Sequence, residues 1–176
     1  MRAAKKNKKT LVVGAGNILL RDEGAGVRAL EAFLSEYSAP KAVVFLDAGA
    51  AGLAVLDRMK DYTDIIIIDA ARMKKRPGAV HRISGDMISK SAIRTTAHDI
   101  GLNEALELAA FDGDCPDVTL IGIEPKDITP GLGLTPCVEK KIPKAVLKIK
   151  AELERLGFKS AKRGKNARIP LGKKYS

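Results

Sequence analysis

Three side chains in this sequence have the chemistry to contact a divalent metal together. Glu23 lies in segment 22–26, where glycines let the backbone turn tightly around a carboxylate. Asp69 follows four consecutive isoleucines, and His98 lies near the predicted start of a helix, whose dipole favours a neutral imidazole. Carboxylate oxygens and an imidazole nitrogen suit a borderline divalent metal. The sequence therefore predicts a metal-contacting site, provided that the three residues converge.

Two of these residues also have a structural explanation that the sequence leaves open. A carboxylate just before a helix, such as Glu23, interacts favourably with the positive end of the helix dipole. An aspartate at the end of a strand, such as Asp69, commonly caps a following helix. The sequence has no HExxH, CxxC or GxSxG motif to fix the geometry of a site. The other histidine, His81, lies in a predicted edge strand beside Arg82, and we expect it at the surface.

The glycine turn at 14–17 raises the alternative of a nucleotide-binding domain. A glycine-rich turn after the first strand admits a pyrophosphate in such folds. The third glycine of that fingerprint would fall at Leu19, and the charges of Asp22 and Glu23 would repel a phosphate. Asp47 is still placed to bind a ribose. Nucleotide binding is therefore kept as a weaker alternative.

Alternating strands and helices are predicted to position these residues. Short apolar runs predict strands, and apolar residues at helical spacing predict helices. We expect strands at 11–13, 42–46, 65–68, 79–83 and 118–123, and helices at 27–37, 53–59, 102–111 and 136–156. Thr135 is expected to cap the last helix, and Pro136 suits its first turn. This alternation predicts an α/β fold with a doubly wound sheet, helices on both faces and sites at the carboxyl ends of the strands.

Most of the positive charge lies at the two ends of the chain. The formal net charge is +10, but residues 1–9 and 159–176 hold twelve of the 31 Lys and Arg residues and none of the 21 acids. We expect these segments to be solvated basic tails around a single domain at 10–158, which is slightly acidic. Nucleic acid is therefore not an expected partner.

The cysteines and the apolar runs indicate a cytoplasmic protein. Cys115 and Cys137 lack CxxC spacing and are expected to be reduced thiols. The basic N-terminus is followed by no apolar run that fits a signal peptide or a transmembrane span. We expect no membrane partner.

At the candidate residues the sequence resembles the hydrogenase maturation endopeptidases, which process the large subunit of nickel-iron hydrogenases. The resemblance covers about residues 10 to 157. It rests on six segments that occur in the order seen in the family, namely 14–28, 47–49, 68–70, 97–102, 122–125 and 133–136. The first segment joined to the histidine segment in a chain of this size is a specific signal.

The resemblance implies a fold, a substrate and a site. The fold would be a three-layer α/β/α sandwich around a mostly parallel, five-stranded twisted sheet. The substrate would be the large-subunit precursor, which loses its C-terminal extension after nickel insertion. A monomer is expected independently of the resemblance, and the sequence does not determine the oligomeric state. Glu23, Asp69 and His98 correspond to the metal-contacting residues of the family. The nickel would be presented by the substrate, and no organic cofactor is implied.

The catalytic roles within this site are left open. Either Glu23 or Asp69 would activate water, which makes the expected enzyme an aspartyl-type endopeptidase. A non-catalytic maturation factor that checks the metal without cutting would use the same three residues. Glu124 ends a strand on the same side of the sheet and is left outside the site. The basic run 72–76 is expected to be a solvated loop, and docking of an acidic segment of the precursor is the weaker alternative.

Overall fold

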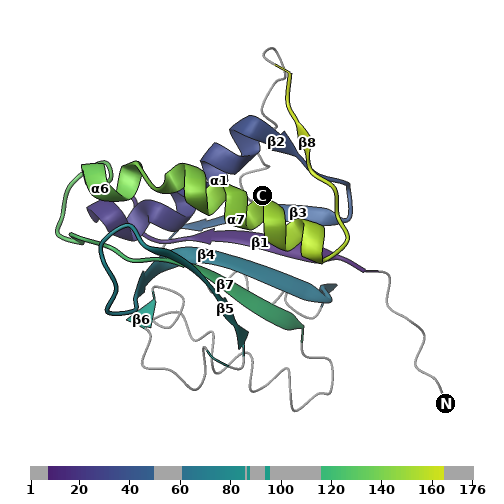
Figure 1. Cartoon of the computed structure of the whole chain (residues 1–176), viewed down its shortest axis with the longest axis horizontal. Coiled ribbons are helices and arrows are strands. Elements are labelled where there is room, and N and C mark those ends of the chain that lie inside the picture. The colour runs from purple at the N-terminus through teal and green to yellow at the C-terminus, as the bar shows by residue number, and fades with distance from the viewer. Residues whose placement is uncertain (1–7, 50–60, 86, 88–93, 96–115, 165–176) are drawn as a thin grey trace.

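The computed structural model describes residues 8–49, 61–85, 87, 94–95 and 116–164, and a mostly parallel sheet lies at its centre (Figure 1). Five strands lie side by side in the order β3-β1-β4-β7-β5. Their bounds are β1 Thr10–Ala15, β3 Val43–Gly49, β4 Asp64–Arg72, β5 Val80–Ser84 and β7 Asp117–Ile123. All neighbours are parallel except β5, the edge strand, which is antiparallel to β7. The prediction of a mostly parallel, five-stranded α/β sheet is confirmed.

The two central strands are apolar because both of their faces are covered. All six residues of β1 are buried, as are the first eight residues of β4. Alternate side chains enter two separate hydrophobic clusters: Val12 and Ile66 lie in one, Leu11 and Ile65 in the other. A parallel strand that is buried on both faces reads as a continuous apolar run, and the four isoleucines of β4 follow this rule.

Two helices cover one face of the sheet. These are α1 (Ala25–Glu36) and α7 (Ile142–Arg155), which lie next to each other above the strands (Figure 1). Phe33 of α1 and Ile149 of α7 are fully buried in the cluster that contains Val12 and Ile66. The helices predicted at 53–59 and 102–111 fall outside the described residues. The prediction of helices on the second face of the sheet therefore stays a prediction.

The last predicted helix is divided in two. It consists of α6 (Pro136–Glu139) and α7, with a turn between them at Lys140 and Lys141. Pro143 explains the break, because a proline has no N–H to donate to the carbonyl four residues earlier, that of Glu139, and its ring clashes with that carbonyl. Thr135 occupies the N-cap position of α6 and Pro136 lies in its first turn, as predicted, but the Thr135 side chain makes no capping hydrogen bond.

A buried carboxylate attaches α7 to the edge of the sheet. Glu152 accepts hydrogen bonds from Arg82 of β5 at 2.6 Å, from Arg155 at 2.7 Å and from the Thr119 hydroxyl of β7 at 3.1 Å. Burial alone would raise the pKa of Glu152, but the hydrogen bonds from Arg82 and Arg155 outweigh it and lower the pKa to about 2. The charged form of this carboxylate is therefore favoured by folding.

The start of the predicted C-terminal tail is paired with the domain. The short strand β8 (Ala161–Lys162) is antiparallel to β2 (Tyr37–Ser38), and Arg163 Nε donates to the carbonyl of Tyr37 at 2.8 Å. In the N-terminal tail the described residues begin at Lys8, and in the C-terminal tail they end at Gly164. Among the helices that the structure describes, none is both long and apolar enough to cross a membrane.

Candidate active site

Asp69 lies inside β4, at the carboxyl end of the sheet. The pairing of β4 with β1 ends at Ile68, opposite Gly14, whereas Asp69 itself pairs with Gly122 of β7. The side chain is fully buried. Because β4 continues to Arg72, Asp69 does not cap a helix, and that structural explanation was wrong. Burying a carboxylate in an apolar sheet is costly unless the charge is paired, and such buried carboxylates are frequent at functional sites.

Glu23 reaches the same edge of the sheet from the loop after β1. It lies in a single turn of 3-10 helix, η1 (Arg21–Gly24), and is partly exposed. Gly16 makes this approach possible, since it has a φ of 123° and a Cβ at this position would lie 1.8 Å from the carbonyl oxygen of Glu23. Only glycine fits this conformation and this distance. The glycine turn therefore serves to bring the Glu23 backbone against the end of β1.

Gly26 brings the start of α1 against the strand that carries Asp69. A Cβ on Gly26 would lie 2.1 Å from the carbonyl oxygen of Ile68 and 2.4 Å from that of Ala15. The turn η1, which precedes α1, also contacts β4. The structure thus places Glu23 and Asp69 at the same carboxyl edge, on adjacent elements.

His98 lies outside the described residues. The described residues nearest to it in sequence form β6 (Arg94–Thr95), in which Thr95 pairs with Ala71, two positions beyond Asp69. Within the described ranges, no group of three or more His, Cys, Asp and Glu side chains could hold a metal ion. The predicted trio therefore stays a prediction, with two of its members located at one edge of the sheet.

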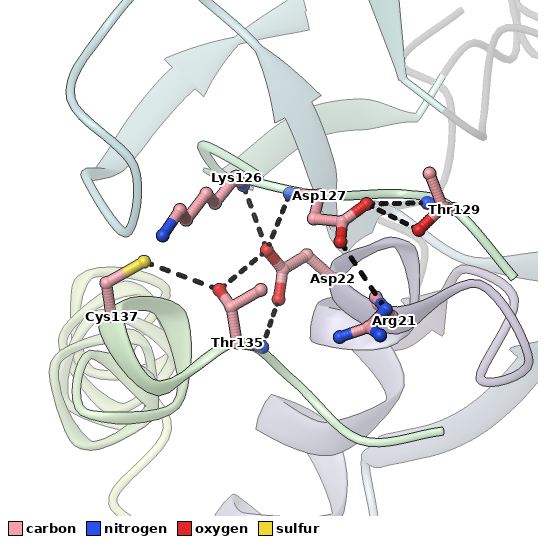
Figure 2. Close-up of polar contacts among 7 residues, drawn as sticks. All are labelled: Arg21, Asp22, Lys126, Asp127, Thr129, Thr135 and Cys137. Atoms are coloured by element: carbon pink, nitrogen blue, oxygen red, sulfur yellow. Dashed lines mark hydrogen bonds and ion pairs between the residues drawn. The ribbon is translucent and has the colours of Figure 1, made fainter. Parts of the chain in front are cut away.

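Asp22 is a buried residue whose role the sequence did not indicate. Its carboxylate accepts four hydrogen bonds (Figure 2). Oδ2 accepts from the backbone N–H of Lys126 at 2.9 Å and of Asp127 at 3.0 Å, and from the Thr135 hydroxyl at 2.8 Å. Oδ1 accepts from the Thr135 N–H at 2.7 Å. Since these donors lie 104 to 113 positions further along the chain, no local sequence pattern reveals them.

The segment that holds Asp22 is itself ordered by polar contacts. Asp127 accepts hydrogen bonds from the Thr129 N–H at 2.9 Å and the Thr129 hydroxyl at 2.8 Å, which lower the pKa of Asp127. Its carboxylate also lies 3.4 Å from Arg21 Nε. Cys137 is a half-buried free thiol with its Sγ 3.3 Å from Thr135 Oγ1, whereas Cys115 lies outside the described residues.

Glu124 has a structural role. It is buried, and its Oε2 accepts the backbone N–H groups of Met73 at 2.7 Å and of Lys75 at 3.1 Å. It thereby fixes the backbone of the basic run 72–76, whose Arg and Lys side chains are exposed as expected of a solvated loop. This arrangement agrees with leaving Glu124 outside the site.

The residues that suggested nucleotide binding serve other purposes. Gly16 packs against the backbone of Glu23, which occupies the space next to the turn. Asp47 is exposed on β3, and its carboxylate accepts the N–H of Gly49 at 2.9 Å. His81 is exposed on β5, as predicted. The glycines are thus explained by close packing.

Comparison with known proteins identifies the family. A family model described as hydrogenase maturation protease matches residues 27–152. The chain belongs to this family. The hydrogenase 2 maturation protease of Escherichia coli K12 is 36% identical over 158 residues, which cover 88% of this chain and 96% of the relative.

Solved structures of similar proteins agree with the fold and the enzyme class. The hydrogenase maturating endopeptidase HybD from E. coli is 35% identical with a TM-score of 0.80, over 88% of this chain and 98% of that chain. The NiFe hydrogenase maturation protease HybD from Thermococcus kodakarensis is 28% identical with a TM-score of 0.67, over 82% and 98%. The predicted resemblance is confirmed, and the protein is a peptidase, a hydrolase of hydrogenase maturation.

Proposed function

We propose that this protease removes the C-terminal extension of a nickel-iron hydrogenase large-subunit precursor after nickel insertion, acting as a monomer in the cytoplasm. Its family membership supports the substrate class. The proposed site is supported mainly by one observation: buried Asp69 and partly exposed Glu23 lie at the same carboxyl edge of the sheet. In parallel α/β sheets, ligands bind outside this edge.

Glu23, Asp69 and His98 would contact the nickel that the substrate carries, and no organic cofactor takes part. Two carboxylates and an imidazole suit such a metal. Thr95, the described residue nearest to His98 in sequence, is paired with Ala71 beside the end of β4. Either Glu23 or Asp69 would accept a proton from the attacking water, as in an aspartyl-type peptidase.

The decisive experiment is the incubation of the purified protease with nickel-loaded precursor, followed by the mass of the large subunit. The wild-type protease should yield a subunit shortened at its C-terminus. Asp69→Asn keeps the shape and removes the charge, and His98→Ala removes the imidazole; each should slow cleavage by about 100-fold or more. His98→Ala should change the free energy of unfolding by less than about 1 kcal/mol.

Asp117→Asn is the matched control. Asp117 is an exposed aspartate at the amino end of β7, on the edge of the sheet opposite to Asp69. Its substitution should leave the rate unchanged. Folded Asp69→Asn and His98→Ala proteins that cleave at the wild-type rate would remove these residues from the site. A wild-type protein that binds the nickel-loaded precursor but leaves its mass unchanged would instead be a metal-checking factor.

A further inference from the structure

Asp22 connects the turn that carries Glu23 to a segment more than 100 positions away. It is fully buried, and its four hydrogen bonds come from three residues of segment 126–135 (Figure 2). A carboxylate is acceptor-only and has sites for about four donors, so it fits this set of donors as no neutral side chain does. An asparagine at this position would present its amide N–H₂ group to at least one backbone N–H.

Backbone contacts reinforce this connection. The N–H of Arg21 donates to the carbonyl of Gly131 at 3.0 Å, and the N–H of Asp22 donates to the carbonyl of Asp127 at 3.1 Å. Arg21 has a φ of 47°, a left-handed conformation that is unfavourable for a residue with a side chain. Such a conformation persists only where the surroundings hold it, and here the surroundings are segment 126–135.

Glu23 follows directly and depends on the same turn. Its own N–H donates to the carbonyl of Leu20 at 3.1 Å, within the turn, and its carbonyl packs against Gly16. The turn is therefore held on one side by the end of β1 and on the other by Asp22. If the side-chain bonds of Asp22 were lost, only backbone bonds such as that from Arg21 to Gly131 would tie the turn to segment 126–135, and we expect the backbone of Glu23 to be held less firmly.

We propose that Asp22 is a positioning residue for the peptidase, holding the Glu23 carboxylate where it meets the metal and the scissile bond. This inference rests on the proposed role of Glu23. Asp22 is itself buried behind the turn and so acts on the reaction only through its neighbour. Displacing a reacting group by about 1 Å can reduce a rate by about 100-fold, so a loosened turn is sufficient to affect catalysis.

The first test uses two variants that weaken the Asp22 hydrogen bonds: Asp22→Asn, and Thr135→Val, which removes the hydroxyl while keeping the side-chain shape almost unchanged. Each should lower kcat for cleavage of nickel-loaded precursor by about 10- to 100-fold, with KM changed by less than about threefold. Thr135→Ser restores a hydroxyl and should recover most of kcat. Thr63→Val is the matched control, because the Thr63 hydroxyl bonds the carbonyl of Lys9 and the Asp64 carboxylate at the amino end of β4, on the edge of the sheet opposite to Asp69.

The second test is a double-mutant cycle between Asp22→Asn and Glu23→Gln, with residual rates measured over long incubations. If Asp22 acts through Glu23, the double variant should cleave no more slowly than Glu23→Gln alone. Rate losses that multiply would show an independent structural role and overturn the proposal. So would wild-type kcat in folded Asp22→Asn and Thr135→Val proteins.

The two proposals fail in different ways. Wild-type cleavage by Glu23→Gln would remove Glu23 from the site, which overturns the proposed role of Glu23 and this inference together. Loss of cleavage in Glu23→Gln combined with full activity in Asp22→Asn would overturn only the positioning role. Faster hydrogen exchange at the N–H groups of Lys126 and Asp127 in folded Asp22→Asn would confirm that the connection had been loosened.

Discussion

Gly26→Ala tests whether the close approach of α1 to β4 sets the geometry of the site. The added Cβ would lie 2.1 Å from the carbonyl oxygen of Ile68, whereas ordinary contacts begin at 3.4 Å. The neighbouring atoms belong to the backbones of two central strands and cannot rotate away. To relieve the overlap, the start of α1 would have to move by about 1 Å, taking the turn with Glu23 away from Asp69.

The expected effect on stability is the difference between two opposing contributions. Alanine in place of glycine inside a helix stabilises it by about 1 kcal/mol. Overpacking a well-packed interior costs about 1–3 kcal/mol. We expect a cost near the upper end of this range, because the added Cβ meets two backbone carbonyls. We expect a net loss of about 1–2 kcal/mol in the free energy of unfolding. Cleavage of the precursor should fall by about 100-fold, because of the 1 Å displacement.

Urea unfolding and the cleavage rate are the two measurements, and Gly164→Ala is the control. Nothing lies within 4 Å of a Cβ on Gly164, and its φ lies outside the left-handed range. That variant should change stability by less than about 0.5 kcal/mol and leave cleavage unchanged. A Gly26→Ala protein as stable and as active as the wild type would show that this contact does not determine the position of Glu23.

Two further predictions concern regions outside the site. The pKa of Glu152 is about 2 in the folded protein against 4.5 for a free glutamate, so its charge contributes about 3 kcal/mol of stability above pH 5. Because the folded pKa is the lower one, this contribution declines as the pH falls from 4.5 to 2. In urea unfolding, the free energy of unfolding of Glu152→Gln should therefore be lower than that of the wild type by about 3 kcal/mol at pH 7 and by about 2 kcal/mol at pH 3.5. A difference that does not change with pH would contradict this. Deleting the residues after Lys159 removes the exposed β8 but no buried apolar side chain of α7. Circular dichroism should therefore still show one cooperative thermal transition, with a free energy of unfolding reduced by about 1–2 kcal/mol. A non-cooperative transition would show that the tail is structural.

The strands were predictable because a buried strand has a local composition, a short apolar run, that can be recognised in the sequence. Ile65 to Ile68 form an unbroken apolar run, which in a strand requires cover on both faces and therefore a central position. Asp69 could be assigned to the carboxyl edge of the sheet because it comes directly after this apolar run. The length of β4 was not predictable, because its last residues pair with β6 and β7 and are held by partners distant in sequence.

The sequence by itself determined the sheet and the edge of the sheet at which Glu23 and Asp69 lie. The tertiary structure decided which polar residues serve as supports. Thr135 was predicted only as a helix cap, and besides occupying that N-cap position it donates twice to Asp22. Asp22 stood out only as a charge beside Glu23 but is fully buried. The physical reason is that burying a carboxylate is favourable only where several donors converge on it. These donors come from a segment more than 100 positions away, and only folding brings them together.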